Sequence, residues 1–167
     1  MNIDIKSTIK TEVVSSMDLS SDSKFLATVT RKPVSTSSKF EYILTTYHPQ
    51  KLEKVKSVSI YQSYDEATHW VKIAPFRQLI AVSGKFFIYF FKLDTLELLR
   101  KEPHKMKVIN YISFSGDGKL LGVCGNGTIL WDTDFFEQFF LPFNSNIWFQ
   151  FIEFSKIKRR IFLISQH

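Results

Sequence analysis

Two glycine-rich segments are the residues whose types and spacing first suggest chemistry. Gly116-Asp117-Gly118-Lys119 and Gly125-Asn126-Gly127 have the composition of phosphate-binding loops. A phosphate-binding loop needs four residues between its first glycine and a Gly-Lys-Ser/Thr end, followed by a helix. Neither segment has that spacing, and Leu120-Leu121 continues as an apolar strand. We therefore interpret both as hairpin turns, where glycine supplies the positive φ that a tight turn needs.

The other residues that carry chemistry do not converge on a catalytic site. Cys124 lies within an apolar strand, which favours a buried structural thiol over a nucleophile. Asp65-Glu66 lies in a polar loop with no partner for general acid–base work. No histidine has a second histidine or a cysteine at metal-ligand spacing; the histidines are His48, His69, His104 and His167. The sequence thus predicts no enzyme activity, no metal site and no cofactor.

Two segments are candidates for binding a partner. The segment from 135 to 154 carries nine aromatic residues, a type enriched in interface cores; those proposed to contact a partner are Phe135, Phe136, Phe139 and Phe140. A basic cluster with the charge to meet a phosphate-rich surface follows it, comprising Lys156, Lys158, Arg159 and Arg160. Packing within the fold and a solvated turn are the competing interpretations of the two segments.

A repeated pattern organises the chain around these residues. The pattern, apolar-Ser-x-Asp-x-Lys-apolar-apolar, is clearest from Phe114 and from Leu19, with weaker copies from Ile73 and Phe154. These four anchors are separated by 54, 41 and 40 residues along the chain. A polar, Ser-rich insertion at 31–39 accounts for the longer first interval.

Each copy predicts four short β-strands and no helix. Apolar and polar residues alternate up to the anchor, which is the period of a strand with one face in a core. A polar turn follows, and then a short apolar run typical of a strand buried on both faces. These second strands are expected at 25–29, 79–82, 120–124 and 161–164. Third strands are expected at 42–46, 87–91 and 128–131, and fourth strands at 56–61, 96–101 and 136–141.

Four strands per unit, a period of roughly 40 residues and a unit that ends in Trp131-Asp132 resemble the WD40 repeat family. His104 stands 27 residues before Trp131, which is similar to the family's Gly-His to Trp-Asp arrangement, although Pro103 replaces the glycine. The resemblance implies a buried Asp-His-Ser-Trp hydrogen-bond network within a blade. Only His104, Ser113 and Trp131 match that network here.

The expected fold is all-β: a WD40-like β-propeller, partial or an open arc of four-stranded antiparallel blades. We expect a single domain over 1–167, with approximate repeats at 12–62, 67–103 and 104–144 and an incomplete one at 145–167. Closed propellers have roughly four to eight blades. About three blades and part of a fourth therefore suggest a fragment, a chain completed by a copy or another subunit, or an open arc. A β-sandwich is the competing fold.

Composition limits the classes of function. The chain has 167 residues, a net charge of +6 and one cysteine, so it forms no internal disulfide, as suits a reducing compartment. It carries no signal-peptide core and no apolar stretch of membrane-spanning length, so we expect a cytoplasmic protein, with a nuclear location left open. The resemblance implies a non-enzymatic protein–protein interaction scaffold, with partners in a multi-subunit complex or a chain completing the propeller. The alternative is a nucleic-acid- or acidic-phospholipid-associated module using the basic turn at 156–160.

Overall fold

The computed structural model describes residues 13–63, 69–141, 147–155 and 160–165. These ranges contain fourteen strands and no helix that is long and apolar enough to cross a membrane. The strands are β1 (Val13–Leu19), β2 (Leu26–Pro33), β3 (Phe40–His48), β4 (Glu53–Ser63), β5 (Val71–Ile73), β6 (Leu79–Ser83), β7 (Phe87–Lys92), β8 (Leu98–Pro103), β9 (Ile109–Phe114), β10 (Leu120–Gly125), β11 (Gly127–Asp132), β12 (Glu137–Phe140), β13 (Phe149–Phe154) and β14 (Ile161–Ser165).

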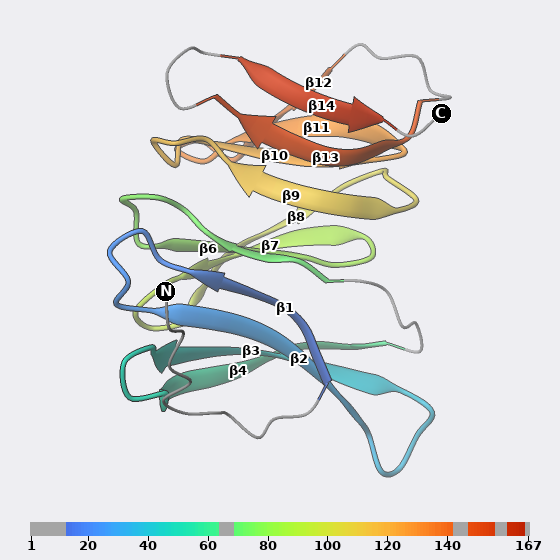
Figure 1. The fold of residues 1–167 in the computed structure, drawn as a ribbon. Coiled ribbons are helices and arrows are strands. Elements are labelled where there is room, and N and C mark those ends of the chain that lie inside the picture. The colour runs from blue at the N-terminus through green and yellow to red at the C-terminus, as the bar shows by residue number, and fades with distance from the viewer. Residues whose placement is uncertain (1–12, 64–68, 142–146, 156–159, 166–167) are drawn as a thin grey trace, which may run out of the picture.

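The strands form successive antiparallel sheets in chain order. Three sheets have four strands, β1–β4, β5–β8 and β9–β12, and β13 and β14 form a two-stranded sheet. Within each sheet every strand pairs with its neighbours in sequence, and the sheets stack one upon the next (Figure 1). This confirms the predicted fold: the chain is an open arc of four-stranded antiparallel blades, a partial WD40-like β-propeller. The serial stack is not a β-sandwich.

The hydrophobic core lies between successive sheets rather than in one centre. The layer between the first two sheets includes Val29, Leu44 and Ile80, and the next includes Phe90, Ile112 and Trp131. Cys124 packs with Ile152 in the layer between the third and fourth sheets, and both are fully buried, as predicted for the thiol. Each blade is therefore held by its neighbours, which is the physical reason that such repeats occur in arrays.

Small residues allow the sheets to approach one another. Ala27, Ala81 and Gly122 occupy the same place in the second strands, each opposite the last-but-one residue of the first strand. A Cβ added at Gly122 would lie 2.5 Å from Cδ1 of Ile152 in the next sheet. Phe162 takes this place in the last sheet, where its side chain is 55% exposed.

The connections between strands gather at two ends of the stack. We call the end that carries the β1–β2, β3–β4, β5–β6, β7–β8, β9–β10 and β11–β12 turns the turn rim; it lies at the left in Figure 1. The crossover rim, at the right, carries the β2–β3, β6–β7 and β10–β11 turns, the β8–β9 connection and the described residues that lead into β5 and β13. Loops held on a rigid scaffold are where binding residues concentrate. The two rims are therefore the candidate binding surfaces of the chain.

Candidate functional site

The repeated Ser-x-Asp-x-Lys pattern builds turns on the turn rim. Ser20 Oγ donates to Asp22 Oδ1 at 2.8 Å, and the same oxygen accepts the Lys24 amide at 3.1 Å. Ser115 and Asp117 repeat the first contact at 2.7 Å. The serine hydroxyls stabilise the ionised carboxylates and so lower the pKa of Asp22 and of Asp117. The segment that resembled a phosphate-binding loop is therefore a hairpin turn, as predicted.

The corresponding turn between β5 and β6 displays an aromatic side chain instead. Pro75 precedes Phe76, and the Arg77 amide donates to the Ala74 carbonyl at 3.3 Å to close the turn. Phe76 has a φ of 57° and is 86% exposed. A left-handed conformation costs an L-residue about 1 kcal/mol or more. Phe76 therefore has both a strained backbone and an exposed side chain. Its side chain gains no free energy from burial in the core that could offset the strain.

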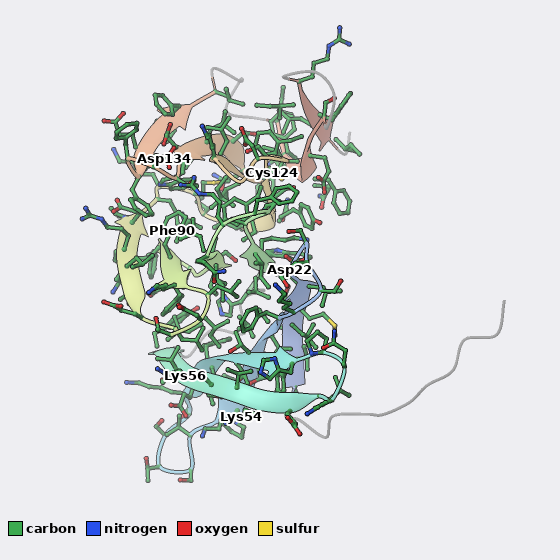
Figure 2. The ribbon with its side chains drawn as sticks, turned by 90° about the vertical axis from the view of Figure 1, so that its left-hand side faces the viewer. Asp22, Lys54, Lys56, Phe90, Cys124 and Asp134 are labelled. Atoms are coloured by element: carbon green, nitrogen blue, oxygen red, sulfur yellow. The ribbon has the colours of Figure 1, made fainter. Side chains whose placement is uncertain are left out.

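Contacts between neighbouring turns link the turn that carries Phe76 to the turn that carries a second exposed aromatic residue. Arg77 Nη1 donates to Thr133 Oγ1 at 2.7 Å, and its Nη2 forms an ion pair with Asp134. Phe135 follows directly and is 74% exposed. Figure 2 looks onto this rim, with Asp134 at its upper left. Two exposed aromatic residues from different blades are thus the sequence neighbours of the two partners in one ion pair, and we call Phe76 and Phe135 the turn-rim pair.

The structure places the other predicted aromatic contacts in different surroundings. Phe139 and Phe140 lie on the outer strand β12 and are 49% and 62% exposed. Phe136 instead packs against the core, with its ring centroid 5.0 Å from that of Phe90 and 5.6 Å from the Arg100 guanidinium. The predicted group therefore divides between a rim, an outer strand and an interior contact.

The predicted basic cluster lies largely outside the described residues. Lys156, Lys158 and Arg159 are not described, whereas Arg160 is exposed immediately before β14. Ile161, the first residue of β14, pairs with Phe154, the last residue of β13, so Arg160 lies at the same end of the stack as the turn-rim pair.

The buried histidines have structural partners. His69 is 1% exposed; its Nε2 lies 2.7 Å from the Tyr61 hydroxyl and its Nδ1 lies 3.1 Å from the Ser83 carbonyl oxygen. These distances fit a neutral ring that accepts from Tyr61 and donates to Ser83. Burial lowers the pKa of His69 to about 4 and also lowers the pKa of His104.

Cys124 and the acidic residues provide no nucleophile or metal cage in the described structure. Burial raises the pKa of the Cys124 thiol to about 12, so the thiolate is not populated near neutral pH. Among the described residues no group of three or more His, Cys, Asp or Glu side chains is arranged to hold a metal ion. Asp18, on the first strand, instead forms an ion pair with Lys72 at 3.6 Å.

The hydrogen-bond network implied by the resemblance does not join its three matching residues. His104 Nε2 lies 3.1 Å from the Gly84 carbonyl oxygen, and Ser113 Oγ donates to Glu153 at 2.9 Å. Trp131 is fully buried, and its indole nitrogen finds no hydrogen-bond partner among the described residues. Ser113 therefore ties two blades together rather than bracing one.

Sequence reasoning missed a second repeated turn feature. Leu52, Leu96 and Phe136 all have positive φ, at 52°, 52° and 57°, and each is followed by a glutamate that opens or precedes the fourth strand. The signal was present as an apolar-Glu pair at similar places in three repeats. Phe76 also had a signal, since an aromatic residue stands at the position that Asp22 and Asp117 occupy in the two clearest copies of the turn.

The fold resembles that of a solved chain in a structure described as "Crystal Structure of Mitotic Checkpoint Complex". The TM-score is 0.65, with 12% sequence identity over 87% of this chain. The match covers 42% of that chain, so this chain spans less than half of its length. In all, 534 solved chains match, which marks the fold as a common one that does not itself select a function. No protein-family model and no curated protein sequence matches.

Proposed function

We propose that this chain is a non-enzymatic scaffold of WD40-like repeats that binds other proteins through its turn rim. The observation that carries the proposal is the turn-rim pair, Phe76 and Phe135. Both rings are exposed on turns that a rigid stack of blades holds in place. Strained backbone and exposed apolar side chains contribute little to the stability of the core. Such groups are typical of sites that bind a partner.

The ion pair that links the two turns favours a protein partner. Arg77 and Asp134 place charged groups in fixed positions beside the two exposed aromatic residues in the sequence. Protein interfaces combine such central aromatic anchors with a surrounding polar contact. The similar solved chain belongs to a structure described as a complex, which supports protein partners without naming them.

Replacement of the turn-rim pair tests this function. In the full chain, Phe76→Ser combined with Phe135→Ser should weaken the capture of co-purifying proteins by at least about 30-fold, because the truncation of even one hot-spot residue costs about 2 kcal/mol. Phe86→Ser is the matched control, since Phe86 is also exposed, at 60%, but lies on the crossover rim. Equal loss in the control, or full retention by the double variant, would refute the proposal.

A further inference from the structure

Positive charge gathers on the crossover rim. The Lys and Arg residues in or beside its described connections are Arg31, Lys32, Lys39, Lys85, Lys101, Lys105 and Lys107. The described carboxylates at this end are Glu41 and Glu102, and the other described carboxylates lie toward the turn rim. Among the described residues, the basic excess is therefore concentrated at this end, where it attracts an anionic surface.

Exposed apolar side chains stand among these cations. Phe86 in the β6–β7 turn is 60% exposed, Val108 before β9 is 42% exposed, and Ile147 and Trp148 before β13 are 38% and 45% exposed. Three separate connections thus present apolar tips at the same end of the stack. Lys85 Nζ lies 5.2 Å from the ring centroid of Phe86, so a cation lies directly beside one of these tips.

Hydrogen bonds fix two of these connections against their neighbours. The Phe86 carbonyl accepts the His104 amide at 3.0 Å, which links the β6–β7 turn to the segment entering β9. Asn126 Oδ1 then accepts the amides of Lys107 and Val108 at 2.8 and 3.1 Å. The apolar tips are therefore held in position before any partner arrives, which reduces the entropy lost on binding.

A hydrogen bond also holds the start of β13, which Ile147 and Trp148 precede. Asn110 Nδ2 donates to the Phe149 carbonyl at 2.8 Å, and Trp148 is the residue immediately before Phe149. The surface thus continues from the second blade to the last described sheet.

The kinds of apolar residue distinguish two anionic partners. Single-stranded nucleic acid is held by aromatic rings on which bases stack, and neither Val108 nor Ile147 offers a ring. A bilayer interface accepts aliphatic and aromatic side chains alike and places tryptophan at the headgroup level. Nearby lysines add attraction to anionic headgroups. The mixture on this rim therefore fits a lipid surface better than a nucleic acid.

We propose that the crossover rim docks on a membrane surface containing anionic phospholipid. Phe86, Val108 and Trp148 enter the interface, while Lys105 and Lys107 meet the headgroups. The turn rim, at the opposite end, is then left facing the solution, so the chain can hold a protein partner at a membrane. Anionic lipids are concentrated on the cytoplasmic leaflet, which agrees with the location expected from the sequence. This second site is independent of the proposed protein-binding function.

Vesicle sedimentation tests the charge component. The full chain should bind vesicles of phosphatidylcholine mixed with phosphatidylserine and not vesicles of phosphatidylcholine alone, with binding that weakens as salt is added. A triple variant should weaken binding about 100-fold, because each lysine near an anionic surface contributes about fivefold to binding. Its changes are Lys85→Gln, Lys105→Gln and Lys107→Gln. The matched control neutralises three exposed turn-rim residues and should stay within about twofold of wild type; its changes are Lys24→Gln, Lys51→Gln and Lys119→Gln.

The apolar component has its own paired test. Phe86→Ser should weaken binding to the phosphatidylserine vesicles at least about fivefold, given the area of one phenylalanine side chain, while Phe76→Ser leaves it unchanged. The proposal is overturned by three results: no binding above phosphatidylcholine alone, equal loss in both lysine triples, or lysine-dependent binding of oligouridylate RNA without vesicle binding. Each result leaves the capture of proteins by the turn rim to be judged separately.

Discussion

At the scale of single residues, buried polar groups in this chain stabilise contacts between blades. Tyr61 belongs to the first sheet, and His69 lies two residues before β5, the first strand of the second sheet. The Tyr42 ring stacks on Tyr61 and meets His69 edge-on at a centroid distance of 4.0 Å. This aromatic cluster removes the imidazole from water and explains why its neutral form is favoured.

The lowered pKa of His69 makes stability depend on pH. Its folded pKa of about 4 lies below the ordinary value of 6.5, so its contribution is complete above about pH 6.5 and is lost as pH falls toward 4. The difference corresponds to about 3 kcal/mol. Urea unfolding at pH 7 and pH 4.5 should show a clearly smaller acid loss in His69→Gln than in wild type. An equal loss in the two proteins would contradict the assignment, because His104 is present in both.

At the scale of elements, the second strand of each blade sets the distance to the next sheet. Ala27, Ala81 and Gly122 leave room for the facing strand, whereas Phe162 occupies the same place on the last sheet and points to solvent. Close packing of this kind makes the interior sensitive to added volume.

Gly122→Val should therefore destabilise the fold by about 1–3 kcal/mol through overpacking. Its new side chain would meet Cδ1 of Ile152 and the ring of Phe154 in the fourth sheet. Gly116→Ala is the control, since a Cβ at Gly116 has nothing within 4 Å, and it should change stability by less than about 0.5 kcal/mol. Urea midpoints measure both, and similar midpoints for the two variants would show that the sheets are not packed as described.

The strands and turns were predictable because their signals are local. Alternation, the apolar second strands and the Ser-x-Asp-x-Lys turns act within a few residues of one another, so the sequence pattern carries them. The surfaces were less predictable. Phe135 and Phe136 are adjacent, yet the Phe135 ring is exposed to solvent whereas the Phe136 ring packs against Phe90. The backbone at Phe136 has a positive φ, which an alternating strand pattern does not predict. The crossover rim forms only when three connections that are distant in the sequence come together in the fold. No single segment of the sequence therefore predicts it.

At the scale of the whole molecule, the chain is an open arc with two unlike rims (Figure 1). The last sheet exposes Phe162 and Ile164 at 55% and 60%, whereas its half-exposed Phe151 meets Tyr111 of the preceding sheet edge-on. In this sheet the bulky Phe162 stands where the other sheets have alanine or glycine. The turn rim carries two exposed phenylalanines, and the crossover rim carries basic residues with exposed apolar side chains. The stack holds these two surfaces at opposite ends, as the proposed binding of a protein at one rim and a membrane at the other requires.

Amide hydrogen exchange of the chain, alone and with its co-purified protein partner, tests the central claim most directly. The account predicts that the partner slows exchange in the turns at 74–77 and 132–136, which carry Phe76 and Phe135, while the β6–β7 turn around Phe86 is unchanged. Protection confined to the crossover rim, or no protection at either turn, would contradict the claim that the turn rim is the protein-binding surface.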